Sequence, residues 1–184
     1  YNLSSAKIMN CRIVNNNGNG VGSPSMDDIA WHLMIASSEI SFNNNDGVFW
    51  NGRGEVSIIG CKIEHNNSSG VATQRAAPVL LEGDTICFNQ EGLSFDGDYY
   101  CEINVESCIF RGNGQAIYTI QVTSSIRNCL IDGMNVPSSG FHCDWQSNMK
   151  VDSCTFDSLT GDVFYLLQAR LDISNTKIFD NQRL

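Results

Sequence analysis

Apolar residues recur along this chain in short alternating runs separated by polar turns. The common unit is Val/Ile-x-x-Cys/Ser/Thr-x-Ile/Phe, as in "VESCIF" at Val105–Phe110. Its small residue is called the marker here. The markers are Cys11, Ser38, Cys61, Thr85, Cys108, Cys129, Cys154 and Thr176. They lie about 24 residues apart, a period typical of solenoid repeats.

The positions around each marker predict strands rather than helices. The residues three before and two after the marker are almost all apolar, and Glu82 is the one serious exception. Apolar residues two apart indicate strands whose alternate side chains face one core, and the phase shift at the marker indicates a corner. A polar turn such as "NNNGNG" or "HNNSSG" follows, and then a third apolar pair, for example Val48 and Trp50 or Val163 and Tyr165. Three short strands per coil predict an all-β parallel solenoid.

From Ala6 to Asn181 this pattern resembles the right-handed parallel β-helix repeats of the pectin-lyase-like superfamily. The resemblance implies one domain over residues 1–184, with about eight coils of roughly 24 residues and three strands each. In that superfamily a corner between strands often carries stacked Asn side chains. The candidates here are Asn10, Asn128 and Asn175, each directly before a marker. Because open solenoid ends expose strand edges, we expect neighbouring segments of a longer chain, or other subunits, at both ends.

The cysteines follow the repeat. Five of the eight occupy the marker column: Cys11, Cys61, Cys108, Cys129 and Cys154. Stacked side chains with parallel Cβ vectors are awkward for disulfides, so we predict a column of free thiols that act as small hydrophobes. There is no CxxC or CxxH cluster to hold zinc. Abundant thiols favour a reducing cytoplasm. The resemblance favours an extracellular or cell-surface location, which we adopt as the prediction with the cytoplasm as the alternative.

Charge and hydropathy limit the classes of partner that we expect this chain to bind. The net charge is -9, and only 11 scattered Lys and Arg are present, which disfavours nucleic acid. No apolar run approaches the roughly 20 residues of a membrane-spanning helix, so we predict no membrane insertion.

Candidate chemistry lies on the outward positions of the third strand. The predicted outward row is Gly22, Phe49, Ala72, Ser94, Tyr118, His142 and Phe164. In the stretch "FHCDW", His142 and Asp144 are the candidate catalytic pair, since a His–Asp pair can move protons. The candidate substrate-binding residues are Tyr118, Trp145, Phe164 and Arg170. No cofactor is expected, except that Asp96 and Asp98 are weak Ca²⁺ candidates.

The resemblance also implies what an enzyme of this superfamily would carry. Polygalacturonases have NTD, GHG and RIK sequences and alginate epimerases have DPH, and this chain has none of them. We therefore favour a non-catalytic structural or binding module, a rigid rod that presents a face to a glycan or protein. The alternatives are a polysaccharide lyase or glycoside hydrolase acting at His142 and Asp144, and an intracellular substrate-recognition scaffold.

Overall fold

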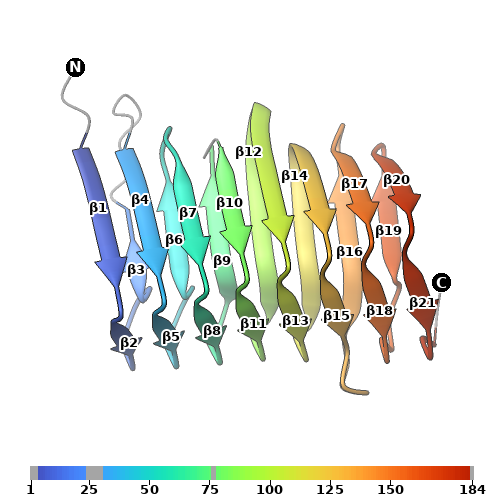
Figure 1. Cartoon of the computed structure of the whole chain (residues 1–184), viewed down its shortest axis with the longest axis horizontal. Helices are drawn as coiled ribbons and strands as arrows, with labels where there is room; N and C mark the ends of the chain where they lie inside the picture. Colours follow the sequence, from blue (N-terminus) through green and yellow to red (C-terminus); the bar gives the residue numbers. More distant parts are fainter. Residues whose placement is uncertain (1–3, 24–30, 76–77, 183–184) are drawn as a thin grey trace.

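The computed structural model describes residues 4–23, 31–75 and 78–182, and every regular element within them is a β-strand. The strands lie side by side along one axis, with the two chain ends at opposite ends of the rod (Figure 1). All strand pairs are parallel, and paired residues in successive coils are 27 positions apart at Ile13 and Ile40 but 21 apart at Phe110 and Ile131. The predicted parallel β-solenoid is confirmed. None of the described segments forms a helix long and apolar enough to cross a membrane.

Each coil contributes strands in three columns. The first column contains β1 (Ser4–Met9), β4 (Trp31–Ala36), β7 (Val56–Ile59), β10 (Val79–Glu82), β17 (Asn148–Asp152) and β20 (Arg170–Ser174). The second contains β2 (Arg12–Val14), β5 (Glu39–Ser41), β8 (Lys62–Glu64), β11 (Thr85–Cys87), β13 (Ile109–Arg111), β15 (Leu130–Asp132), β18 (Thr155–Asp157) and β21 (Lys177–Phe179). The third contains β3 (Val21–Gly22), β6 (Val48–Asn51), β9 (Ser69–Gln74), β16 (Ser139–Asp144) and β19 (Phe164–Leu167).

Two long strands join the third column of one coil to the first column of the next. They are β12 (Glu91–Glu106) and β14 (Gln115–Arg127), and β14 bends at Gln121, whose φ is 55°. The first and third columns therefore form one bent 13-stranded sheet, and the second column forms a separate 8-stranded sheet. The eight strands of the second sheet show that eight layers are stacked. The sequence predicted a short third strand in one coil and a short first strand in the next. In β12 and in β14 these two strands form one continuous strand.

The register of the fourth coil corrects the sequence prediction. Ile86 pairs with Ile63 and Phe110, so the marker there is Asp84 and not Thr85. Leu81 then joins the inward row of Ile58 and Val105, and Glu82 points outward. The exception at Glu82 came from a one-residue slip, which moves every side chain of a strand to the opposite face.

The stacked asparagines are also not those predicted. Asn10, Asn128 and Asn175 are exposed corner residues with φ values of 52°, 54° and 50°. Asn tolerates this left-handed conformation better than most residues, which explains its use at the corner. The buried ladder lies instead in the polar turns, where each Nδ2 donates to the Oδ1 of the next coil. Its members are Asn16, Asn43, Asn66, Asn89 and Asn113, with successive distances of 2.8, 2.9, 3.1 and 3.2 Å.

A row of small residues packs beside this ladder. A Cβ on Gly47 would lie 2.6 Å from the carbonyl oxygen of Gly70 and 2.8 Å from Nδ2 of Asn66. Gly70 and Gly92 are similarly close to the carbonyl of the following coil. Glycine is therefore required here by the close approach of successive backbones.

The members of the predicted thiol column differ in their burial. Cys61, Cys108, Cys129 and Cys154 are buried free thiols, whereas Cys11, in the first coil, is free but exposed. Hydrogen bonds with the thiols of Cys108 and Cys154, together with burial, raise the pKa of Cys129. Burial also raises the pKa of Cys61. Cys61 and Cys129 are thus held as neutral thiols, whereas the hydrogen bond with Cys129 lowers the pKa of Cys154.

The core fills the space between the two sheets and reaches the surface at the last coil. Leu166, Ile173 and Ile178 are 44%, 46% and 37% exposed, although they continue rows that are largely buried in earlier coils. Coverage of the solenoid ends by neighbouring segments or other subunits remains a prediction.

Candidate functional site

The structure brings His142, Asp144 and Tyr118 together on the outward face of the third column. His142 Nε2 lies 2.9 Å from Asp144 Oδ1, and the Tyr118 hydroxyl donates to Asp144 Oδ2 at 3.4 Å. The rings of Tyr118 and His142 meet edge to face, with centroids 5.0 Å apart. Burial raises the pKa of Tyr118, and the Asp144 carboxylate adds to the rise. Asp144 is therefore engaged by two neighbours, which fixes the pair in place.

The second aromatic neighbour of His142 is Tyr165 and not the predicted Phe164. Tyr165 pairs with His142, and their ring centroids are 4.5 Å apart. Phe164 pairs with Phe141 and packs into the core, with its ring 4.8 Å from that of Phe156. The correction has a simple cause, since an aromatic ring gains more by joining the buried Phe141–Phe156 cluster than by lying in water. Val163, which the sequence predicted as the partner of Tyr165 on the third strand, is buried in the turn that precedes β19.

The other predicted substrate-binding residues lie away from this cluster. Trp145 is 55% exposed at the bend after β16, where its φ is 38°. Arg170 is on β20, which pairs with β17 beyond that bend, and its guanidinium lies 3.0 Å from Asp172. The structure thus places Tyr118 beside His142 but separates Arg170 from it.

The structure describes the side chain of only one of the two Ca²⁺ candidates. Asp96 is exposed on β12, while the side chain of Asp98 lies outside the described residues. Within the part of the chain that the structure describes, no three His, Cys, Asp or Glu side chains gather as metal ligands. Calcium binding stays a prediction.

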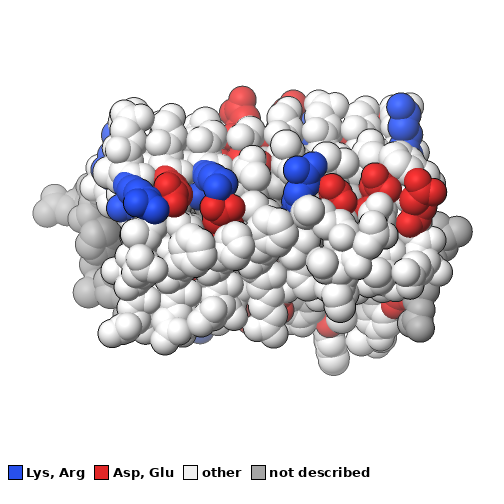
Figure 2. All heavy atoms as spheres, turned by 90° about the horizontal axis from the view of Figure 1, so that it is seen from below, with Lys and Arg blue, Asp and Glu red and all other residues white. Residues whose placement is uncertain are grey.

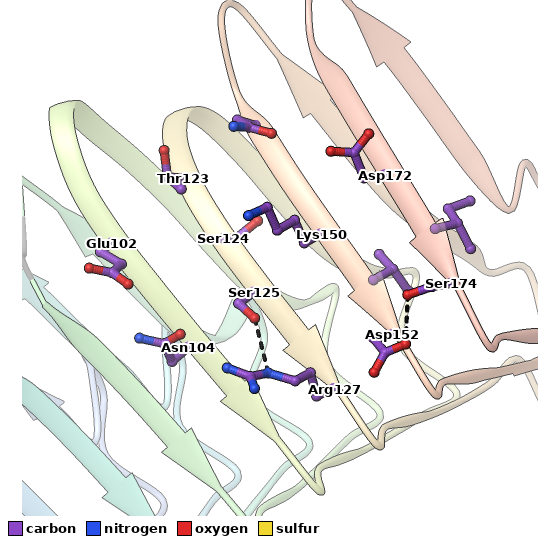
Figure 3. Close-up of a pocket in the computed structure, with 13 residues that line it drawn as sticks. Glu102, Asn104, Thr123, Ser124, Ser125, Arg127, Lys150, Asp152, Asp172 and Ser174 are labelled. Atoms are coloured by element: carbon purple, nitrogen blue, oxygen red, sulfur yellow. Dashed lines mark hydrogen bonds between the residues drawn. The ribbon is translucent and has the colours of Figure 1, made fainter.

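A groove of about 550 Å³ lies on a different face, over the first-column parts of β12, β14, β17 and β20. Figure 3 shows Glu102 and Asn104 on β12, Thr123 and Ser125 on β14, and Lys150 on β17 around it. These residues alternate with buried ones such as Ile103 and Val151, so the strand period aims them outward. The rigid sheet therefore fixes the positions from which these polar side chains extend.

Several polar groups of the groove have no protein partner. Among the described residues, the side chains of Glu102, Asn104, Thr123 and Lys150 form no hydrogen bond or ion pair. Asn148 Oδ1 is buried in the groove wall, also without a partner. A buried acceptor left unpaired costs about 1–3 kcal/mol, which a bound donor would recover. The groove is consequently rich in unused hydrogen-bonding capacity.

Two other charged side chains of the groove already have hydrogen-bond partners within the protein. Arg127 donates to Ser125 at 3.2 Å, and Asp152 accepts from Ser174 at 2.6 Å (Figure 3). Asp152 also accepts from Asn175 at 2.8 Å. The hydrogen bonds from Ser174 and Asn175 hold the pKa of Asp152 below its ordinary value. Lys150 and Glu102 are thus the charges of the groove left for a ligand.

This groove was not predicted from the sequence, because only the outward positions of the third strand were candidates for a site. The signal was present in the first strand, where "CEINVE" and "NMKVD" alternate polar and apolar residues. A hollow, however, depends on side-chain lengths across four strands. The repeat pattern does not encode those lengths.

The second sheet carries a more open hollow of about 460 Å³, whose lining includes Glu39, Lys62 and Thr85. Seen from below in Figure 2, charged side chains of both signs gather in a row along the rod. Its members are largely paired with each other: Arg12 with Glu39 at 3.1 Å, Lys62 with Glu64, and Arg111 with Asp132 at 3.1 Å. Paired surface charges of alternating sign give little attraction for a polyanion.

Stacked parallel coils, an Asn ladder and a column of small marker residues, five of them cysteines, together define a β-helix protein. A family model described as "Right handed beta helix region" matches residues 1–135, well over half of the chain. The chain belongs to this family, which gives the coils their right hand and confirms the resemblance inferred from the repeats. A comparison with curated proteins finds no match.

Proposed function

We propose that this chain is a non-catalytic binding module that holds a glycan in the groove formed by β12, β14, β17 and β20. The observation that carries the proposal is the set of unpartnered polar groups there, including Lys150, Glu102 and the buried Asn148 Oδ1. Sugar hydroxyls both donate and accept hydrogen bonds, so they can satisfy amide, hydroxyl, ammonium and carboxylate groups in one site. A sheet that is ordered before binding also lowers the entropic cost of association.

The mixed charge of the groove favours a hydroxyl-rich ligand over a dense polyanion. Glu102, Asp152 and Asp172 oppose Arg127 and Lys150, so the groove has no excess of positive charge. Lys150 can contact a single carboxylate or a ring oxygen, and Glu102 can accept from a pair of hydroxyls.

Catalysis at His142 and Asp144 is the second candidate, supported by their 2.9 Å contact. Two features argue against it. The cluster is separate from the residues that line the groove, and Asp144 is already occupied by Tyr118. A general acid or base must reach a proton on the substrate, and the contact with Tyr118 takes up one oxygen of Asp144.

The test is a titration of the purified chain with neutral and uronate-containing oligosaccharides, with and without Ca²⁺. Binding is measured by calorimetry and product release by a reducing-end assay. We expect binding without turnover, and Lys150→Met should weaken it at least about tenfold, or about 1.4 kcal/mol. The matched control is Lys177→Met, which removes an exposed lysine of β21 on the other sheet and should leave affinity unchanged.

Two results would overturn the proposal. Turnover abolished by His142→Ala or Asp144→Ala would establish the enzyme instead. Absence of binding across the panel would leave a structural or protein-binding rod as the function.

A further inference from the structure

The marker side chains make a repeated hydrogen bond along the interior column. Every marker other than Asp84 donates to the backbone carbonyl oxygen two residues before it. The donors are Cys11, Ser38, Cys61, Cys108, Cys129, Cys154 and Thr176, at distances between 2.8 and 3.5 Å. Thiol and hydroxyl groups can do this because each carries a proton.

The oxygen-bearing markers also accept a second bond from the coil before them. Cys11 N–H donates to Ser38 Oγ at 3.1 Å, and Cys154 N–H donates to Thr176 Oγ1 at 3.4 Å. Asp84 Oδ1 takes the same part by accepting from Cys61 N–H at 2.7 Å. Asp84 is therefore integrated into the column as an acceptor.

The second carboxylate oxygen of Asp84, Oδ2, makes no such hydrogen bond while the side chain is ionised. Asp84 is 1% exposed, and Oδ2 is buried without a hydrogen-bond partner. An ionised carboxylate only accepts hydrogen bonds, whereas a protonated one gains an O–H donor. Protonation would give Asp84 the donor that each other marker possesses, with the carbonyl of Glu82 two residues before it as the equivalent acceptor.

We propose that Asp84 is a neutral carboxylic acid in the folded rod and that its ionisation makes the fourth coil a pH-sensitive weak point. Protonated, the side chain acts like the Ser and Thr markers and completes the column. Ionised, it places a charge in the core between the Cys61 and Cys108 layers. A buried charge without an opposite charge beside it, and with one oxygen unpaired, is strongly destabilising.

The groups around Asp84 supply no compensating cation. The preceding coil presents Cys61 and the following coil Cys108, both of them buried thiols. Glu82 on β10 and Glu106 on β12 point outward nearby and pair with each other in register. Burial raises the pKa of Asp84 from 3.8 to about 7, and the charge of Glu82 adds to the rise.

The direction of the pH effect follows from these values. The folded pKa lies above the unfolded one, so the stability gained from the proton is fully present below about pH 4. It falls as pH rises and is lost above the folded value of about 7. Over that interval the unfolding constant should rise by up to about a thousandfold from this group alone.

The first measurement uses the unaltered protein. The ¹³Cγ signal of Asp84, assigned by its loss in Asp84→Asn, reports protonation across pH 4 to 9. We expect a protonated carboxyl at pH 5 that titrates near neutrality. An ionised Asp84 at pH 5 would overturn the proposal.

The second measurement compares urea unfolding midpoints between pH 5 and pH 8. Asp84→Asn and Asp84→Ser keep an acceptor and a donor without a titrating proton, so the fall in midpoint seen in the unaltered chain should shrink in both. Glu82→Gln is the matched control and should retain the fall. A pH dependence that persists in both Asp84 variants, or that disappears in Glu82→Gln, would contradict the assignment.

Discussion

Asn66 donates from Nδ2 to Oδ1 of Asn89 at 3.1 Å, and both side chains are almost completely buried. Asn66 Nδ2 also reaches the carbonyl of Ile40 at 3.3 Å, so one amide group connects three coils. Adjacent asparagines repeat this arrangement, and the turn between the second and third strands is fixed by it.

Replacing Asn66 by Ala should therefore destabilise the rod by about 2–4 kcal/mol, because it leaves the backbone N–H and the Nδ2 of Asn43, which both donate to Asn66 Oδ1, buried and unpaired. Asn67→Ala is the matched control, since Asn67 is exposed and its side chain bonds only Asn44. Its cost should stay within about 0.5 kcal/mol. Urea unfolding of both variants measures the difference, and equal costs would show that the ladder is not the stabilising element.

Gly47→Ala should cost more than Gly18→Ala. The new methyl group at Gly47 would clash with the carbonyl of Gly70, whereas a Cβ at Gly18 meets nothing within 4 Å. We expect a loss of about 1–3 kcal/mol for the first and little change for the second. Thermal unfolding followed by circular dichroism compares them. A tolerated Gly47→Ala would mean that the coils can separate locally.

Substitutions of Phe164 and Tyr165 should differ in how much they destabilise the protein, although the two residues are adjacent. Phe164→Ala removes a ring from the Phe141–Phe156 cluster and should cost about 2–4 kcal/mol, less than a fully buried Phe because it is only half-buried. Tyr165→Ala removes a side chain that is 45% exposed and should cost under about 1 kcal/mol. If Tyr165→Ala cost more stability than Phe164→Ala in denaturant unfolding, Phe164 would point outward as the sequence predicted.

Thiol labelling of the native protein should distinguish the first coil from the others. Iodoacetamide should modify the exposed Cys11 and leave Cys108, Cys129 and Cys154 unmodified until the chain unfolds. The thiolate is the reactive form, and the raised pKa of Cys129 keeps it rare. Peptide mass spectrometry after timed labelling gives the order, and early modification of Cys129 would indicate that the middle coils open readily.

The repeat predicted the fold correctly because each coil carries its own copy of the strand pattern. It failed where one coil departs from the consensus. Thr85 resembles the other small markers better than Asp84 does, and choosing it hid the ladder. With Asp84 as the marker, Asn16, Asn43, Asn66, Asn89 and Asn113 all lie five residues after a marker. Asn181 has the same offset from Thr176 and bonds the backbone of Leu159 and Phe156.

The candidate sites were less predictable than the fold. His142, Asp144 and Tyr118 were found because alternation along a strand is enough to place neighbours on one face. Phe164 was misplaced because the turn between the second and third strands varies in length from coil to coil, so the phase of the strand that follows it cannot be counted from the marker. The groove depends on how far Lys150 and Glu102 extend from different coils, which no local pattern specifies.

The equivalence of Ile40, Ile63 and Ile86 has a consequence for how such a chain can change its length. Each coil contacts only its neighbours, and the coils that carry Ile40, Ile63 and Ile86 present the same Asn, Gly and aliphatic positions to the coil above and below. Removing residues 41–63 would join Ile40 to residue 64 with the next coil already in register. A gene encoding this protein can therefore gain or lose whole coils by recombination, and the rod lengthens or shortens without any new packing solution.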